Sequence, residues 1–77
     1  MNFNKGDIIK ITFIDCESFP GWSFSDNTKI MYLYAVGFFL KQDNLFTDIY
    51  MGYNTEGGLM NVQRIPNGSI IKPIEKL

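Results

Sequence analysis

The sequence has no histidine and only one cysteine among its 77 residues. Histidine is the side chain that most often serves as general base and metal ligand near neutral pH, so its absence weakens the case for an enzyme or a metal protein. One cysteine cannot form an internal disulfide, which favours a reducing compartment. We therefore expect a protein without catalytic residues, bound metal or cofactor.

Net charge is also nearly absent. Seven basic and eight acidic residues give −1, too little for strong binding to a duplex phosphate backbone or for mimicry of DNA. The longest apolar run, residues 30–40, is too short to span a bilayer, and residues 1–6 do not resemble a signal peptide. These absences predict a cytoplasmic protein with no membrane and no duplex DNA among its partners.

Aromatic residues, in contrast, are abundant, at 16% of the chain. A single domain over residues 1–77 buries only about 60% of its unfolded surface, so its core is small. The aromatic surplus must then serve dense packing, a subunit interface or ligand contacts.

Five segments rich in β-branched and aromatic residues predict strands, namely 8–14, 29–41, 45–53, 59–65 and 70–74. The second is long enough for a helix, but its composition and Gly37 favour a long bent strand. It is apolar on both faces, so it is either central or packs one face against another subunit. That face would have either Tyr32, Tyr34 and Phe38 or Met31, Leu33 and Phe39. We therefore expect a homo-oligomer.

Turn residues separate these segments. They occupy 42–44 and 54–58, and the stretch 66–69 predicts a 3₁₀ turn before the last strand. Pro73 cannot donate a ladder hydrogen bond, so the last strand should lie or end at an edge. No segment predicts a helix of useful length.

Five short strands, a long first loop over residues 15–28 and a tight turn before the last strand resemble the Src-homology-3-like barrel. The resemblance is architectural, covers most of the chain and implies an all-β, small, partly open five-stranded barrel. The acidic-aromatic motif and paired tryptophans of the peptide-binding branch are absent, so recognition of proline-rich peptides is not implied.

The order of four short motifs resembles that of small uncharacterised phage proteins. The motifs are Asp-Cys-Glu-Ser at 15–18, Trp22, Val-Gly-Phe-Phe-Leu at 36–40 and Ile-Pro-Asn-Gly at 65–68. The resemblance implies a viral origin and supplies no activity.

The first loop contains most of the candidate site residues. Asp15 and Glu17 lie two positions apart and could hold a cation or act as acid and base; a solvated strand end that accepts turn hydrogen bonds is the simpler interpretation. Cys16 has no imidazole partner, so a small buried hydrophobe is favoured over a nucleophile.

Phe19, Trp22 and Phe24 follow among turn residues and could stack on a base or clamp an apolar side chain. The alternative is that Trp22 folds back as the lid of the small core. Arg64, the only arginine, could grip a phosphate or carboxylate, or could be a solvated strand residue. The predicted ligand-binding set is Asp15, Glu17, Ser18, Phe19, Trp22, Phe24, Arg64 and Asn67.

These features predict a non-catalytic binding protein. The first hypothesis is a phage-encoded homo-oligomer that intercepts a host component such as a nucleotide-type defence signal. The second is an adaptor or inhibitor that docks on a host protein through its apolar face. The third, binding of single-stranded nucleic acid, is disfavoured by the acidic balance.

Overall fold

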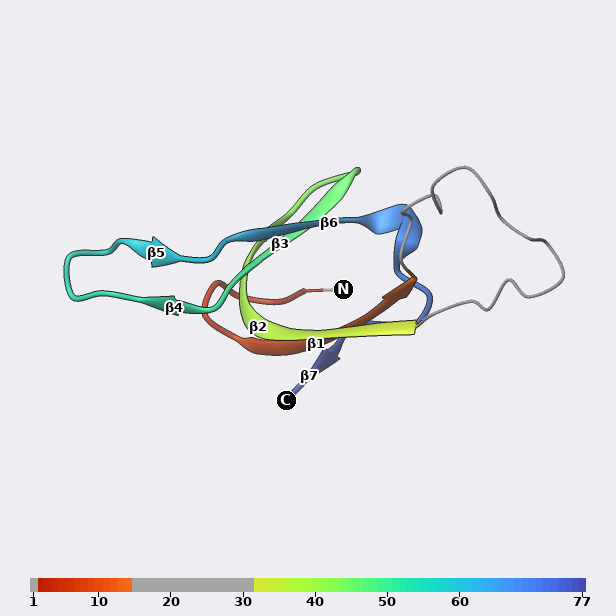
Figure 1. Cartoon of the computed structure of the whole chain (residues 1–77), viewed down its shortest axis with the longest axis horizontal. Helices are drawn as coiled ribbons and strands as arrows, with labels where there is room; N and C mark the ends of the chain where they lie inside the picture. The colour runs from red at the N-terminus through yellow and green to blue at the C-terminus, as the bar shows by residue number, and fades with distance from the viewer. Residues whose placement is uncertain (1, 15–31) are drawn as a thin grey trace, which may run out of the picture.

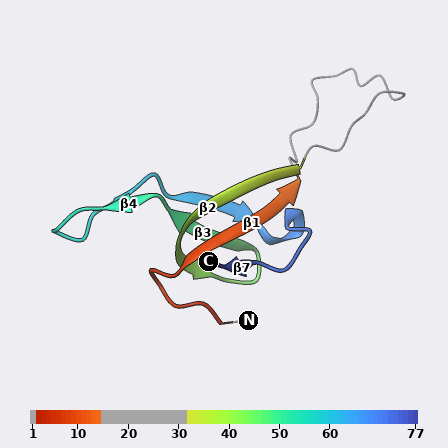
Figure 2. The same cartoon turned by 90° about the horizontal axis from the view of Figure 1, so that it is seen from below.

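The computed structural model describes residues 2–14 and 32–77. Within them the chain is all-β, without an α-helix, as the alternation of residues predicts (Figures 1 and 2). The elements in chain order are β1 (Ile8–Ile14), β2 (Tyr32–Gln42), β3 (Phe46–Tyr50), β4 (Gly52–Tyr53), β5 (Leu59–Met60), β6 (Gln63–Pro66), the 3₁₀ turn η2 (Asn67–Ser69) and β7 (Glu75–Lys76). No helix in this part of the chain is long and apolar enough to cross a bilayer.

Five of the strands form one antiparallel sheet in the order β6-β3-β2-β1-β7. The sheet curls so that β6 and β3 lie across from β1 and β2, but no ladder between described residues joins β6 to β7 (Figure 1). The sheet is therefore open. Strands β4 and β5 form a separate two-stranded ribbon that projects away from it (Figure 1).

The core lies inside the curl of the sheet. It consists of five buried residues, Ile9, Ile11, Phe39, Ile49 and Ile65. Partly buried apolar side chains from the termini and from η2 onward pack against them, Phe3, Ile70 and Ile74 among them. The alternation within β1 places Ile9 and Ile11 on this inner side.

Strand β2 is long and curved, as its composition and Gly37 predict (Figure 1). A Cβ at Gly37 would lie 3.0 Å from the carbonyl oxygen of Tyr50, so glycine allows β2 and β3 to approach closely. The register of the β2–β3 ladder shifts between Phe39 and Lys41. Such a bulge bends a strand, which lets β2 serve both halves of the curled sheet.

Two of the predicted strands are interrupted. The segment 45–53 breaks at Met51 into β3 and β4, and the segment 59–65 breaks into β5 and β6. Asn61 lies in the second break with a φ of 52°, a left-handed conformation that asparagine tolerates better than most residues. These breaks separate the projecting ribbon from the main sheet, so the prediction of five continuous strands was wrong in this respect.

The last strand was also misplaced. Residues 70–74 contribute only an isolated bridge between Ile70 and Phe13, and the final ladder is formed by β7 against Ile9 and Lys10. Pro73 lies just before this strand, consistent with its missing N–H donor. The predicted 3₁₀ turn is confirmed as η2.

Candidate functional site

The two faces of β2 have different environments although both are apolar. On the inner face Gly37 and Phe39 are buried. On the outer face Tyr32, Tyr34 and Val36 are exposed by 53%, 63% and 44%. The alternating residues of β2 thus form one face in the core and one face in contact with solvent.

The exposed apolar residues continue onto the neighbouring strands. In the β1–β2 ladder Ile8 lies opposite Phe38 and Lys10 opposite Val36, and in the β2–β3 ladder Phe38 lies opposite Tyr50. We call this surface the tyrosine face. It consists of Ile8, Lys10, Tyr32, Tyr34, Val36, Phe38, Tyr50 and Tyr53, and so includes all four tyrosines of the chain.

An aromatic cluster forms one end of the tyrosine face. The rings of Phe38 and Tyr50 stack with centroids 5.2 Å apart, and Tyr53 meets both edge-on at 5.8 and 6.4 Å. Strict alternation predicts Tyr53 on the side opposite Tyr50, but the break at Met51 brings both to the same side. Tyr50 is buried while Tyr53 is 68% exposed, so the cluster is both anchored and accessible.

Lys10 supplies a positive charge beside the other aromatic residues. Its ammonium lies 5.0 Å from the centroid of the Tyr34 ring, within the range of a cation–π interaction. On its other side Lys10 lies opposite Glu75 in the β1–β7 ladder. Tyrosine combines a large apolar ring with a polar hydroxyl, so it can lie on a surface that is exposed to solvent and also pack in an apolar contact.

Arg64, a predicted ligand-binding residue, is engaged within the protein. Its Nε and Nη2 donate to the two carboxylate oxygens of Asp48 at 3.0 and 3.1 Å, and its guanidinium lies 5.2 Å from the Phe46 ring centroid. Hydrogen bonding to Asp48, and then the charge of that carboxylate, raises the pKa of Arg64 above its ordinary value. The Asp48 side chain is only 3% exposed, so Arg64 neutralises a buried charge.

Asn67, the other predicted residue in the described part, belongs to a chain of hydrogen bonds. Gln42 Nε2 donates to Thr47 Oγ1 at 2.7 Å, and Thr47 Oγ1 donates to Asn67 Oδ1 at 2.6 Å. Asn67 Nδ2 then donates to the carbonyl oxygen of Asp43 at 2.8 Å. This chain ties η2 to the β2–β3 turn.

The Asp43 carboxylate fixes that turn. Its Oδ1 accepts hydrogen bonds from the backbone N–H groups of Leu45 and Phe46, both at 2.8 Å. These bonds, Phe46 first, lower the pKa of Asp43 below its ordinary value. Arg64 and Asn67 thus both lie at the β6–η2 end of the sheet, in separate internal interactions.

The other six predicted residues, Asp15, Glu17, Ser18, Phe19, Trp22 and Phe24, lie outside the described residues. Cys16 does too. The tyrosine face was not in the predicted ligand-binding set, although the sequence gives part of it as one of two candidate subunit contacts. Tyr32, Tyr34 and Phe38 alternate along one strand whose other face is equally apolar, and only one face can be buried in so small a core.

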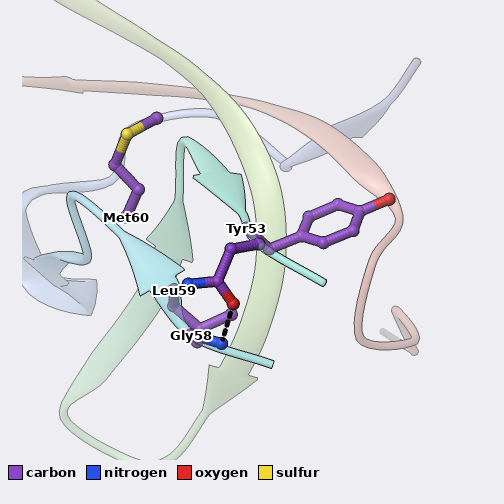
Figure 3. A pocket seen from close by; sticks show the side chains of 5 residues that line it. Tyr53, Gly58, Leu59 and Met60 are labelled. Atoms are coloured by element: carbon purple, nitrogen blue, oxygen red, sulfur yellow. Dashed lines mark hydrogen bonds between the residues drawn. The ribbon is translucent and has the colours of Figure 1, made fainter. Parts of the chain in front are cut away.

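The projecting ribbon has an open hollow of about 220 Å³ lined by Tyr53, Asn54, Gly58, Leu59 and Met60 (Figure 3). The Asn54 Oδ1 that faces it already accepts hydrogen bonds from the backbone N–H groups of Glu56 and Gly58. The Tyr53 ring points away from the Met60 side chain (Figure 3). The hollow therefore follows from the shape of the hairpin, and we assign it no ligand.

Comparison with protein-family models, with curated proteins and with solved structures gives no match for this chain.

Proposed function

We propose that this chain is a small, non-catalytic binding protein that docks on a polypeptide partner through the tyrosine face. The observation that carries the proposal is the gathering of Tyr32, Tyr34, Phe38 and Tyr50 on the outer side of β2 and β3, with Tyr53 of β4 packed edge-on against them. Tyrosine and other aromatic residues are enriched where proteins bind one another. A contiguous apolar patch of this kind on a small protein marks an interaction site.

The proposed scaffold is a partly open Src-homology-3-like barrel. Three observations support it: the curl of the sheet, the pairing of β1 with both β2 and β7, and the 3₁₀ turn η2 that precedes the last strand. In this arrangement the inner face is fully used by the core. Binding then falls to the outer face and the connecting loops.

Capture of a nucleotide-type ligand is the second candidate. Exposed tyrosine rings beside Lys10 could stack on bases, as aromatic residues do in proteins that bind single-stranded nucleic acid. Docking on a polypeptide is favoured because Lys10 is the only basic residue of the tyrosine face, and because Arg64 already donates to Asp48. A rise in melting temperature on adding nucleotides, lost in Tyr34→Thr, would favour the second candidate.

Site-specific photo-crosslinking in cells tests the proposal. A photoreactive phenylalanine analogue replaces Tyr34 in one variant and Leu45 in the control. Leu45 is similarly exposed, at 67%, but lies in the β2–β3 turn away from the tyrosine face. We expect a discrete protein adduct from position 34 and none from position 45. No adduct at position 34, or the same adducts at both positions, would refute docking through the tyrosine face.

A further inference from the structure

The size of the tyrosine face is the first observation that bears on its partner. Tyr32, Tyr34 and Tyr53 are more than half exposed. At 150–250 Å² for each aromatic side chain, they offer on the order of 300–450 Å². Ile8 and Val36, each almost half exposed, enlarge this area. The total approaches the roughly 600 Å² that each partner contributes to the smaller specific interfaces.

The low charge of the surface is the second observation. Within the tyrosine face Lys10 is the one charged residue, while Lys41 lies at the far end of β2 opposite Asp48. The β7 margin of the face adds Glu75, which lies opposite Lys10 in the ladder. Interfaces between identical subunits are more apolar than those of transient complexes and are depleted in charge at their centre. The whole chain has a net charge of −1, so two copies repel each other only weakly.

The placement of the two charges is the third observation. Lys10 and Glu75 are neighbours of opposite sign that lie between Val36 and the β7 edge of the sheet. In a twofold interface both subunits use the same patch of surface. Each contact between one residue of the first subunit and another residue of the second therefore occurs twice, with the roles of the subunits exchanged. A second copy turned by 180° can therefore place each lysine opposite the other copy's glutamate.

We propose that the partner of the tyrosine face is a second copy of this chain, joined in a twofold dimer with Lys10 of each copy facing Glu75 of the other at the rim. This inference rests on the proposed function, because it names the polypeptide that the tyrosine face binds. The tyrosines and Val36 supply the apolar centre of the interface. The Lys10–Glu75 pairs set its orientation.

A charge exchange between two variants tests the inference by sedimentation equilibrium. Lys10→Glu leaves glutamate facing glutamate in a homodimer, and Glu75→Lys leaves lysine facing lysine. Each variant alone should dimerise about tenfold more weakly than wild type, since like charges placed across an interface are unfavourable. An equimolar mixture should recover dimers, because the heterodimer restores opposite charges in both pairs.

The mixture separates the interface from folding, because mixing cannot repair a defect within one chain. Dimers that are insensitive to these changes, or variants that remain weak when mixed, would overturn the proposed arrangement. A wild-type protein that stays monomeric at high micromolar concentration would overturn the self-association itself. If the protein is monomeric but position 34 crosslinks to a different protein, docking through the tyrosine face still holds and only the dimer is refuted. If the protein is monomeric and position 34 gives no adduct, both proposals are refuted.

Discussion

The inner and outer faces of β2 have similar composition but different surroundings. Inside the curl, Phe39 packs with Ile49 and Ile65, and Gly37 gives β3 room to approach. Outside, Tyr34 and Val36 face solvent. The comparison shows that in a domain with one small core, a second apolar face is left over from folding. It is thus available for binding.

Truncating a side chain on the inner face should lower the free energy of unfolding more than truncating one on the outer face. Ile49→Ala removes a fully buried side chain between β2 and β6 and should lower the free energy of unfolding by about 2–5 kcal/mol. Val36→Ala is the matched change on the tyrosine face and should cost far less. Urea denaturation measures both. Equal losses for the two variants would show that the outer face is also packed.

A smaller effect is expected where β2 and β3 approach each other. In Gly37→Ala the new Cβ would lie 3.0 Å from the Tyr50 carbonyl oxygen and 3.2 Å from Ile49 Cδ1. Overpacking of this kind costs about 1–3 kcal/mol. Gly68→Ala is the control, since its Cβ would meet nothing within 4 Å. A Gly37→Ala protein as stable as wild type would argue against the close approach of β2 and β3 at this position.

Removing Arg64 and removing the charge of Asp48 should destabilise the protein to different extents, although the two side chains form one ion pair on the outer side of β3 and β6. Arg64→Met leaves the Asp48 carboxylate buried without its bidentate partner, whereas Asp48→Asn leaves a half-exposed guanidinium that water can solvate. We expect a lower melting temperature for Arg64→Met than for Asp48→Asn. The reverse order would mean that the carboxylate is solvated in the native protein.

Acid should weaken the β2–β3 turn. The native pKa of Asp43 lies below its ordinary value of 3.8, so its contribution to stability is present above pH 3.8. That contribution is lost as the pH falls below 3.8 through the native pKa. Unfolding curves between pH 5 and 2.5 measure it. In Asp43→Asn the free energy of unfolding should depend less on pH over this range. The same pH dependence in the variant and the wild type would exclude Asp43 as its source.

The smallest effect on folding should come from the tyrosine face. Tyr34→Thr keeps a residue that favours strands and removes an exposed ring, so the free energy of unfolding should change by only about 0.5 kcal/mol. The same change should abolish association in sedimentation experiments. A large loss of stability with association intact would show that Tyr34 serves the fold.

The sequence predicts the parts of this fold that depend on local pattern. Alternation identifies β1 and β2, and turn chemistry identifies the Asp43 turn and η2. Gly57 has the positive φ, 87°, that its place in the 54–58 turn suggests. These features depend on residues close in sequence, which is why they could be predicted.

The remaining features depend on contacts between distant segments. Nothing local to Met51 marks the break between β3 and β4, and β7 forms only because β1 has an edge to pair with. The partnership of Arg64 with Asp48 likewise follows from the register of β3 and β6. Alternation shows that two faces of β2 are apolar, but only the curl of the sheet selects which one is buried.

The central proposal is that two copies of this chain associate through the outer face of β1 and β2. Amide NMR spectra of the isotope-labelled wild type, recorded over a dilution series, test it most directly. The account predicts concentration-dependent shifts that cluster at Tyr32, Tyr34, Val36 and Lys10, with β6 unchanged. Shifts confined to β6 or to the projecting ribbon, or spectra that do not change with concentration, would contradict it.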